Sequence, residues 1–257
     1  MPADTPIPDA IPAASLILMR DGAEGDGPPE ILMVRRAATL AFLGGAMVFP
    51  GGRVDPADHA MVAKDDPDPD EAAARVAAIR ETIEEVGLAL GLSPSPDPSA
   101  LSALRDGVRQ GQALASLLKE HGLTIESDAL IPFARWCPEH VPVRRFDARF
   151  YLARIDRDAS APMIDGGETV DAVWLPAVSA LSQADRGEIR IIFPTRRMLE
   201  RLALYPDFAT AAADARAWPV RRIIPFLAER DGVPSICMPD DLGFPVISEP
   251  VTRAERG

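Results

Sequence analysis

The chain has 257 residues, 47% of them hydrophobic, which is enough for one enlarged domain or for one domain with an extension. Its formal net charge of −12 argues against a nucleic-acid partner held through phosphates, although a locally positive site can still bind an anionic small molecule. No run of about eighteen apolar residues predicts a membrane span, and the N-terminal residues lack the apolar segment of a secretory signal. Cys137 and Cys237 are too few for a disulfide framework or a cysteine-based zinc site, so we expect a reducing cytoplasm.

The first part of the chain has the pattern of a strand hairpin. Residues 13–20 and 31–35 are short apolar runs typical of buried strands, and a turn dense in glycine and proline separates them. A loop and a short strand ending at Phe49 follow. Next come Gly51 and Gly52, which lack side chains and so allow the backbone to approach a ligand closely.

An acidic stretch separates this glycine pair from the next helix. It contains a single lysine, Lys64, and six aspartates: Asp55, Asp58, Asp65, Asp66, Asp68 and Asp70. We interpret the stretch as a solvated loop, with a direct role in metal binding as the alternative.

Residues 70–88 are the most informative part of the sequence. Asp70 is a suitable N-cap for a helix starting at Glu71, and Gly87 stands where a helix favours a left-handed residue. At about 100° per residue, one face is apolar through Val76, Ile79, Ile83 and Val86, and the opposite face carries Glu81, Glu84 and Glu85. Three clustered carboxylates repel one another unless a cation lies among them, and a hard divalent cation suits oxygen ligands. The alternative is an ordinary solvated helix face.

A second helical pattern follows a proline-rich linker. Residues 99–121 have helical spacing of their leucines, and we predict an insert over about 97–122 that covers the substrate or makes a dimer contact.

Two later segments, 130–136 and 146–155, alternate as strands do. Between and on them lie Arg135, Arg144, Arg145 and Arg149. Arginine binds phosphate through its two-pronged guanidinium, so these side chains are candidates to hold a nucleotide phosphate; ordinary surface arginines are the alternative. Trp136 is interpreted as core or as a wall on which a base stacks, and His140 as a turn residue. The tail contains two helical patterns, one starting near Phe193 and the other at 209–217.

The segment from Arg80 to Leu88, RETIEEVGL, resembles the core of the Nudix hydrolase box, and Phe49-Pro50-Gly51-Gly52 is similar to the glycine entry of that box. The resemblance implies an α/β (α+β) Nudix fold, an α/β/α sandwich with a mixed sheet. It implies a hydrolase domain over 10–185, with the box interrupted by an insertion at 53–69 and followed by the helical insert. A C-terminal helical extension, 186–257, is expected to pack on this domain.

The box departs from the family pattern at three points. The spacing from Gly52 to Arg80 is 80 − 52 = 28, which is 14 more than usual. The usual first glutamate falls on Ala72, and Asp70 or Glu71 are candidates to replace it. Thr82 occupies a position that is usually apolar.

The resemblance also implies the chemistry. Glu84, Glu85 and the carbonyl of Gly51 would hold Mg²⁺ or Mn²⁺. Glu81 would bind a second ion or take the proton from the attacking water, and Arg80 would orient the glutamates by ion pairing. Glu168, in a loop six residues before Trp174, is a further candidate metal ligand and competes with Glu81 as the base.

The substrate expected from the resemblance is coenzyme A or an acyl thioester of it. Arg36, Ala37, Gly45 and the glycine entry fit the upstream signature of coenzyme A-cleaving Nudix enzymes, although a second arginine of that signature falls on Ala41. The likeness is greatest to the Nudix motif 19 branch. Candidate contacts to the nucleotide are Arg36, Gly52, Arg144 and Arg145.

Two alternatives remain open. Another nucleoside diphosphate derivative, such as ADP-ribose, NADH or a nucleotide sugar, is the alternative substrate. A non-catalytic Nudix-fold sensor is the alternative class, although a pure binding module has no chemical reason to keep three glutamates. No nucleic-acid or membrane partner is expected, and a homodimer is possible.

Overall fold

The computed structural model describes residues 10–22, 27–40, 43–138, 145–159, 161–164 and 166–254. Within these residues an eight-stranded mixed sheet has the order β10-β7-β8-β1-β2-β3, with β4 paired to β1 and β9 paired to β2. Its strands are β1 (Ile11–Arg20), β2 (Glu30–Arg36), β3 (Met47–Val48), β4 (Gly51–Arg53), β7 (Ile131–Trp136), β8 (Phe146–Arg154), β9 (Thr169–Pro176) and β10 (Arg222–Ile223). The pairs β1–β8 and β7–β10 are parallel, and the other pairs are antiparallel.

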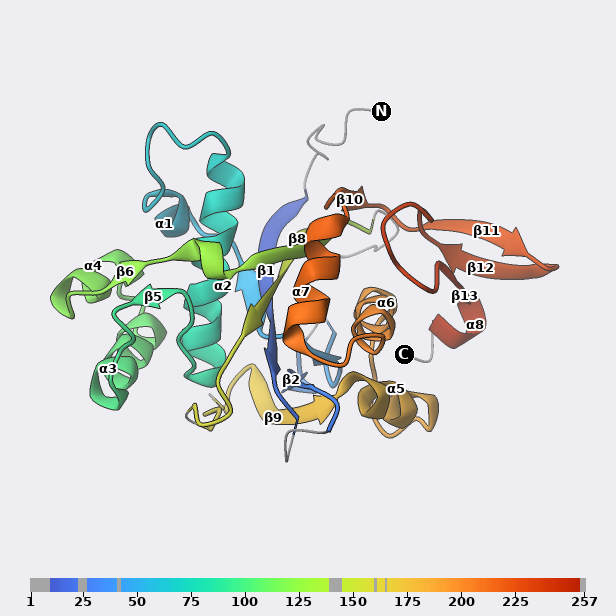
Figure 1. Ribbon diagram of the computed structural model, residues 1–257, viewed down its shortest axis with the longest axis horizontal. Helices are drawn as coiled ribbons and strands as arrows, with labels where there is room; N and C mark the ends of the chain where they lie inside the picture. Colours follow the sequence, from blue (N-terminus) through green and yellow to red (C-terminus); the bar gives the residue numbers. More distant parts are fainter. Residues whose placement is uncertain are drawn as a thin grey trace.

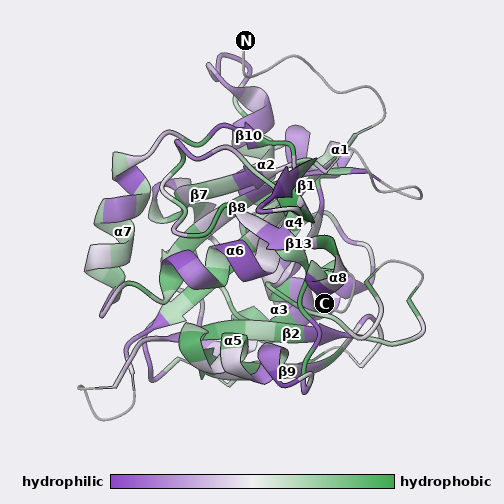
Figure 2. Cartoon of the chain, turned by 90° about the vertical axis from the view of Figure 1, so that its right-hand side faces the viewer, coloured by the Kyte–Doolittle hydropathy of each residue, from purple (hydrophilic) through white to green (hydrophobic). Residues whose placement is uncertain are grey.

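Strand β1 shows why the central strands are apolar on both faces. Leu16 and Leu18 pack into one hydrophobic cluster, whereas Ile17 and Met19 pack into another on the opposite face. Side chains alternate across a strand, so a strand buried on both faces has a nearly continuous apolar sequence. Figure 2 shows the result as hydrophobic residues in the central strands, while the helices outside them carry hydrophilic residues as well.

Helices cover both faces of the sheet, which confirms the predicted α/β/α sandwich (Figure 1). One face carries α1 (Pro56–His59), α2 (Pro69–Val86), α3 (Pro98–Arg109) and α4 (Leu114–Glu120), and the other carries α5 (Ala177–Asp185), α6 (Phe193–Leu202) and α7 (Phe208–Ala217). In the described part of the chain, no helix is both long enough and apolar enough to cross a membrane.

The remaining elements are small. A two-stranded sheet, β5 (Leu92–Ser93) with β6 (Thr124–Ile125), flanks the helical insert, and a 3₁₀ turn follows at Ser127–Ala129. Near the C-terminus, β11 (Phe226–Arg230), β12 (Val233–Cys237) and β13 (Ser248–Pro250) form a separate sheet before α8 (Val251–Ala254). This sheet was not predicted, because the extension over 186–257 was expected to be helical.

The boundaries of α2 correct one prediction. The helix begins at Pro69, and the N-cap is Asp68, whose side chain accepts a hydrogen bond from the backbone N–H of Glu71 at 3.1 Å. The predicted cap at Asp70 was wrong, because Pro69 already has the backbone conformation of a first helical position. At the other end, Gly87 ends the helix with φ of 62°, as predicted.

Trp136 belongs to the core rather than to a stacking wall. Its side chain is buried and packs edge-to-face against Phe193 and Phe244, with ring centroids 5.9 Å away in both cases. The indole therefore joins β7 to α6 and to the C-terminal segment.

Candidate active site

The face of α2 that carries the glutamates lies against β4 and the glycine pair. The backbone N–H of Gly51 donates to Glu85 Oε2 at 3.0 Å. A Cβ on Gly52 would lie 2.4 Å from both Cδ and Oε1 of Glu81, closer than any real contact. A side chain at position 52 would therefore displace the Glu81 carboxylate. The sequence keeps glycine where the backbone meets the two carboxylates.

Arg80 lies between these carboxylates and the backbone. It is 9% exposed, and its Nη1 donates to Glu81 Oε1 at 2.8 Å and lies 3.7 Å from Glu84 Oε2. Its Nη2 donates to the carbonyl oxygen of Arg53 at 2.9 Å. One guanidinium thus joins two of the box glutamates to the end of β4.

Asp58, in the inserted stretch, completes the surroundings of Arg80. It is 1% exposed, and its two oxygens accept from Arg80 Nε and Nη2, both at 2.9 Å. The prediction of a solvated acidic loop was therefore wrong for this residue. The candidate replacements for the missing glutamate lie elsewhere: Asp70 is exposed, and Glu71 pairs with Arg149 at 3.1 Å. The sequence did contain a signal, because Asp-Pro-x-Asp at 55–58 is a helix-capping pattern that fixes its last aspartate.

The charges of the cluster are strongly perturbed. Burial raises the pKa of Glu81 to about 7; the positive charge of Arg80 opposes this shift, and the negative charge of Glu84 adds to it. Burial would lower the pKa of Arg80, but hydrogen bonding to Asp58 and the charges of Glu81 and Asp58 raise it above the usual value. A carboxylate that loses this much hydration gains from a nearby cation.

The donor set fits a hard divalent cation. In the described part of the chain, no three or more His, Cys, Asp or Glu side chains are arranged as a group that could hold a metal ion. Glu81 and Glu84 are instead directed at Arg80, and Glu85 at Gly51. Three carboxylates on one helix, two of which lie against the backbone of Gly51 and Gly52 in β4, supply the oxygen ligands that Mg²⁺ and Mn²⁺ prefer. The residues therefore fit the metal that the sequence predicts.

Glu168, the further candidate metal ligand and base, lies beside Arg36. Its Oε2 is 3.8 Å from Arg36 Nη2, and 67% of its side chain is exposed. The carbonyl oxygen of Glu168 also accepts from the backbone N–H of Ala37 at 2.8 Å. The structure thus brings together two predicted site residues where β2 ends and β9 begins, while the box glutamates lie against β4.

The structure describes some of the residues that were predicted to contact the nucleotide, but not all of them. Arg145 precedes β8, and its carbonyl accepts a hydrogen bond from Ile11 at 2.8 Å. Arg144, His140 and Ala41 lie outside the described residues.

Two arginines of the predicted phosphate-binding group are engaged by carboxylates. Arg135 donates from Nε and Nη2 to the two oxygens of Asp147, each at 2.8 Å, and Arg222 Nε lies 3.1 Å from the same carboxylate. Arg149 pairs with Glu71. Arg135 and Arg149 are therefore better explained as structural ion pairs between strands, or between strand and helix, than as a phosphate grip.

The Asp147 ion pairs predict a dependence of stability on acid. Burial alone would raise the pKa of Asp147, but the hydrogen bond and charge of Arg135, with the charges of Arg222 and Arg149, lower it below the usual 3.8. A depressed folded-state pKa adds stability above the unfolded value, and this stability is lost as the pH falls through the folded value. We expect D147N to unfold at lower urea than the wild type at pH 7, and the difference to shrink below about pH 4. A difference that stays constant down to pH 2 would contradict the role of this charge.

Comparison with known proteins agrees with this geometry. A family model described as the NUDIX domain matches residues 10–102. The crystal structure of a Nudix hydrolase from Alicyclobacillus acidocaldarius is 32% identical, with a TM-score of 0.68 over 80% of this chain and 96% of that one. The chain belongs to the Nudix hydrolase family. This confirms the predicted family, fold and enzyme class.

Two curated Nudix relatives are more distant. A putative nudix hydrolase 7 from Caenorhabditis elegans is 29% identical over 70% of this chain. The match spans only 57% of that protein. The acyl-coenzyme A diphosphatase NUDT19 of Gallus gallus is 26% identical over 74% of this chain and 67% of the relative.

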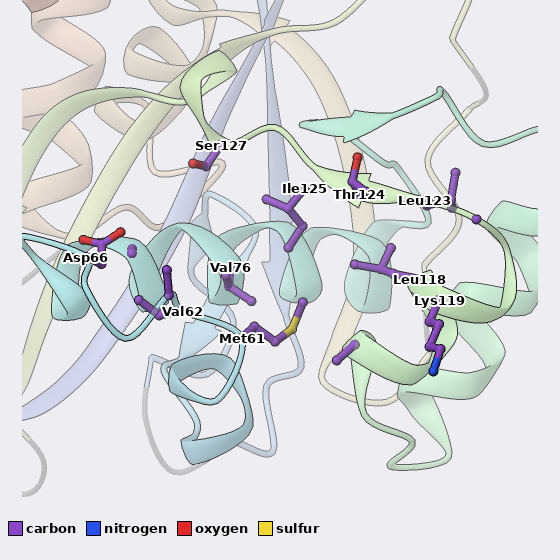
Figure 3. Close-up of a pocket in the computed structure, with 14 residues that line it drawn as sticks. Met61, Val62, Asp66, Val76, Leu118, Lys119, Leu123, Thr124, Ile125 and Ser127 are labelled. Carbon is purple, nitrogen blue, oxygen red and sulfur yellow. The ribbon is translucent and has the colours of Figure 1, made fainter.

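A cavity of about 760 Å³ lies on another side of the Nudix box helix. Figure 3 shows Met61 and Val62 of the insertion facing Leu118 of α4 and Ile125 of β6 across it. The cavity reaches α2 through Ala72 and Val76. Ala72 precedes Glu81 by nine residues, which at about 100° per residue places the two on opposite sides of the helix. The described lining of this cavity includes none of the predicted site residues.

Proposed function

We propose that this protein hydrolyses the P–O–P bridge of a nucleoside diphosphate derivative in a reaction that depends on a divalent metal. The observation that carries the proposal is the grouping of Glu81, Glu84 and Glu85 around buried Arg80 and the Gly51–Gly52 backbone of β4. A diphosphate is anionic and slow to hydrolyse, so its catalyst must offset charge and activate water. Carboxylates that can hold a cation next to a glycine backbone are suited to both tasks.

The residues have separate roles in this proposal. Glu84, Glu85 and the carbonyl of Gly51 would hold Mg²⁺ or Mn²⁺, and the bound cation would withdraw charge from the diphosphate and make water a stronger nucleophile at neutral pH. Glu81 either holds a second ion or accepts the proton of the attacking water at its carboxylate. Arg80 keeps the carboxylates of Glu81 and Glu84 oriented through its ion pairs. Glu168 is the competing candidate for the proton-accepting role.

Coenzyme A or an acyl-coenzyme A is the proposed substrate, with 3′,5′-ADP and (acyl-)phosphopantetheine as products. The upstream residues Arg36, Ala37 and Gly45 support it, as does the similarity to the chicken acyl-coenzyme A diphosphatase. Arg36, Gly52, Arg144 and Arg145 are the proposed contacts to the nucleotide. ADP-ribose, NADH and nucleotide sugars remain the alternative substrates. Cys137 and Cys237 are both buried thiols, which is compatible with the proposed cytoplasmic location.

A panel of diphosphates tests the proposal. The purified protein is incubated with coenzyme A, an acyl-coenzyme A, ADP-ribose, NADH and a nucleotide sugar, each with Mg²⁺, with Mn²⁺ and with a chelator, and the products are separated and identified. We expect hydrolysis only with metal, and fastest with the coenzyme A compounds. Faster hydrolysis of another member would change the substrate, and no hydrolysis of any member would favour the sensor.

A further inference from the structure

We propose that Asp58 is a positioning residue for the reaction, and that the insertion in the Nudix box supplies the carboxylate that controls Arg80. This inference rests on the proposed function. The family resemblance places an alanine, Ala72, where the usual first glutamate of the box would be, so the helix itself lacks that acid. The insertion has folded back and placed Asp58 against the guanidinium instead.

Asp58 is itself held firmly. It is the third residue of the short helix α1, and its Oδ2 accepts from the backbone N–H of Asp55 at 2.8 Å. The side chain of Asp55 is engaged in return with the backbone at position 58, which completes a reciprocal cap. Both oxygens of a side chain that is 1% exposed are therefore in use, so the carboxylate has little freedom to move.

The geometry shows how Asp58 acts through Arg80. The carboxylate of Asp58 accepts hydrogen bonds from Nε and Nη2 of Arg80, and the carbonyl oxygen of Arg53 also accepts from Nη2. The remaining nitrogen, Nη1, lies 2.8 Å from Glu81 and 3.7 Å from Glu84. The planar guanidinium has a fixed fork, so fixing one edge fixes where the other edge points. Asp58 thereby determines how closely Arg80 approaches the box glutamates.

Its charge matters as much as its geometry. Both oxygens of Asp58 lie against the positively charged guanidinium of Arg80, on Nε and Nη2. Asp58 offsets part of that charge from the side away from the glutamates. Without it, the guanidinium would be drawn toward Glu81 and Glu84 and would compete for the oxygens that the cation needs. Asp55 is a poor replacement, because it lies 3.7 Å from Arg80 Nη2 with half of its side chain exposed.

The test measures metal binding directly as well as activity. Asp58→Asn keeps the size and one acceptor oxygen but removes the charge, and Asp58→Glu keeps the charge but shifts it by one methylene. Asp65→Asn is the matched control, since Asp65 is an exposed aspartate of the same insertion. Binding of Mn²⁺ is followed through the electron paramagnetic resonance signal of unbound Mn²⁺, with no substrate present. Hydrolysis is measured in parallel, after circular dichroism has shown that each variant is folded.

We expect D58N to bind Mn²⁺ about 10-fold or more weakly and to have a lower kcat, as is typical when a partner behind a metal ligand is lost. D58E should lie between D58N and the wild type, and D65N should match the wild type. A folded D58N with wild-type Mn²⁺ affinity would overturn the inference. If D58N does not fold, the test uses D58E alone. A D58E variant whose Mn²⁺ affinity and kcat equal those of the wild type would then overturn the inference.

The two proposals fail in distinguishable ways. If the wild type hydrolyses no diphosphate but D58N still binds Mn²⁺ more weakly, the proposed function fails and the positioning role of Asp58 stands. If loss of Glu85 stops hydrolysis but D58N behaves as wild type, the function stands and the positioning role fails.

Discussion

Replacing Glu85 by glutamine should lower the rate of metal-dependent hydrolysis by about 10²–10³-fold, because the charge stabilisation that a bound metal supplies is worth several kcal/mol. The amide oxygen of glutamine can still accept the hydrogen bond that the N–H of Gly51 now donates to Glu85 Oε2 at 3.0 Å. The change therefore removes a charged ligand while it keeps the local contact. The measurement is kcat/KM at saturating Mg²⁺ and at saturating Mn²⁺, together with the melting temperature of each protein.

The control for this variant is E120Q, which makes the same chemical change at an exposed glutamate on α4. We expect E120Q to keep wild-type activity and both variants to keep the wild-type melting temperature within a few degrees. The assignment of Glu85 as a metal ligand would be rejected if E85Q were as active as E120Q at every metal concentration, from limiting to saturating. Equal activity restored only at very high metal concentration would instead show that Glu85 contributes to affinity and is not essential for the chemistry.

The parts of this site that depend on spacing within one helix were predictable from sequence. Glu81, Glu84 and Glu85 share a face of α2 because i, i+3 and i+4 lie together on any helix, and Gly87 ends the helix because few other residues adopt its backbone conformation readily. The same holds for β1, whose apolar run requires cover on both faces. In such cases local geometry decides the outcome, whatever surrounds it.

The parts that depend on how distant segments meet were not predictable. Asp58 and Arg80 are 22 residues apart. The Asp-Pro-x-Asp pattern at 55–58 marks Asp58 as a helix-capping residue, but it does not indicate which distant side chain Asp58 will meet. Arg135 and Arg149 were reasonable candidates for phosphate until β7 and β8 brought Asp147, and α2 brought Glu71, within reach. A long arginine finds a carboxylate partner through tertiary structure, and periodicity along the chain does not encode that choice.

Replacing Arg201 by methionine should destabilise the fold by about 3 kcal/mol, because it removes one partner of a buried ion pair and leaves the charge of the other partner uncompensated. Arg201 donates from Nε and Nη2 to Asp214 Oδ2 at 2.9 and 2.6 Å, and its side chain is 2% exposed. The guanidinium also lies over the ring of Phe133, 4.5 Å from its centroid. One side chain thus connects α6, α7 and β7, and supports our proposal that residues 186–257 form an extension packed on the domain of residues 10–185.

The control variant for Arg201 is R154M, which removes an ion pair of similar length at the protein surface. Arg154 and Asp21 are 2.8 Å apart, but their side chains are 55% and 53% exposed, so solvent weakens their attraction and we expect a loss of about 0–1 kcal/mol. Urea unfolding gives both free energies, and for a chain of this size about 3 kcal/mol corresponds to a melting temperature lower by roughly 6–12 °C. Equal losses in the two variants would mean that burial does not determine the worth of these pairs. A larger loss of unfolding free energy in R201M than in R154M would support a role for Arg201 in packing the C-terminal helices against the sheet.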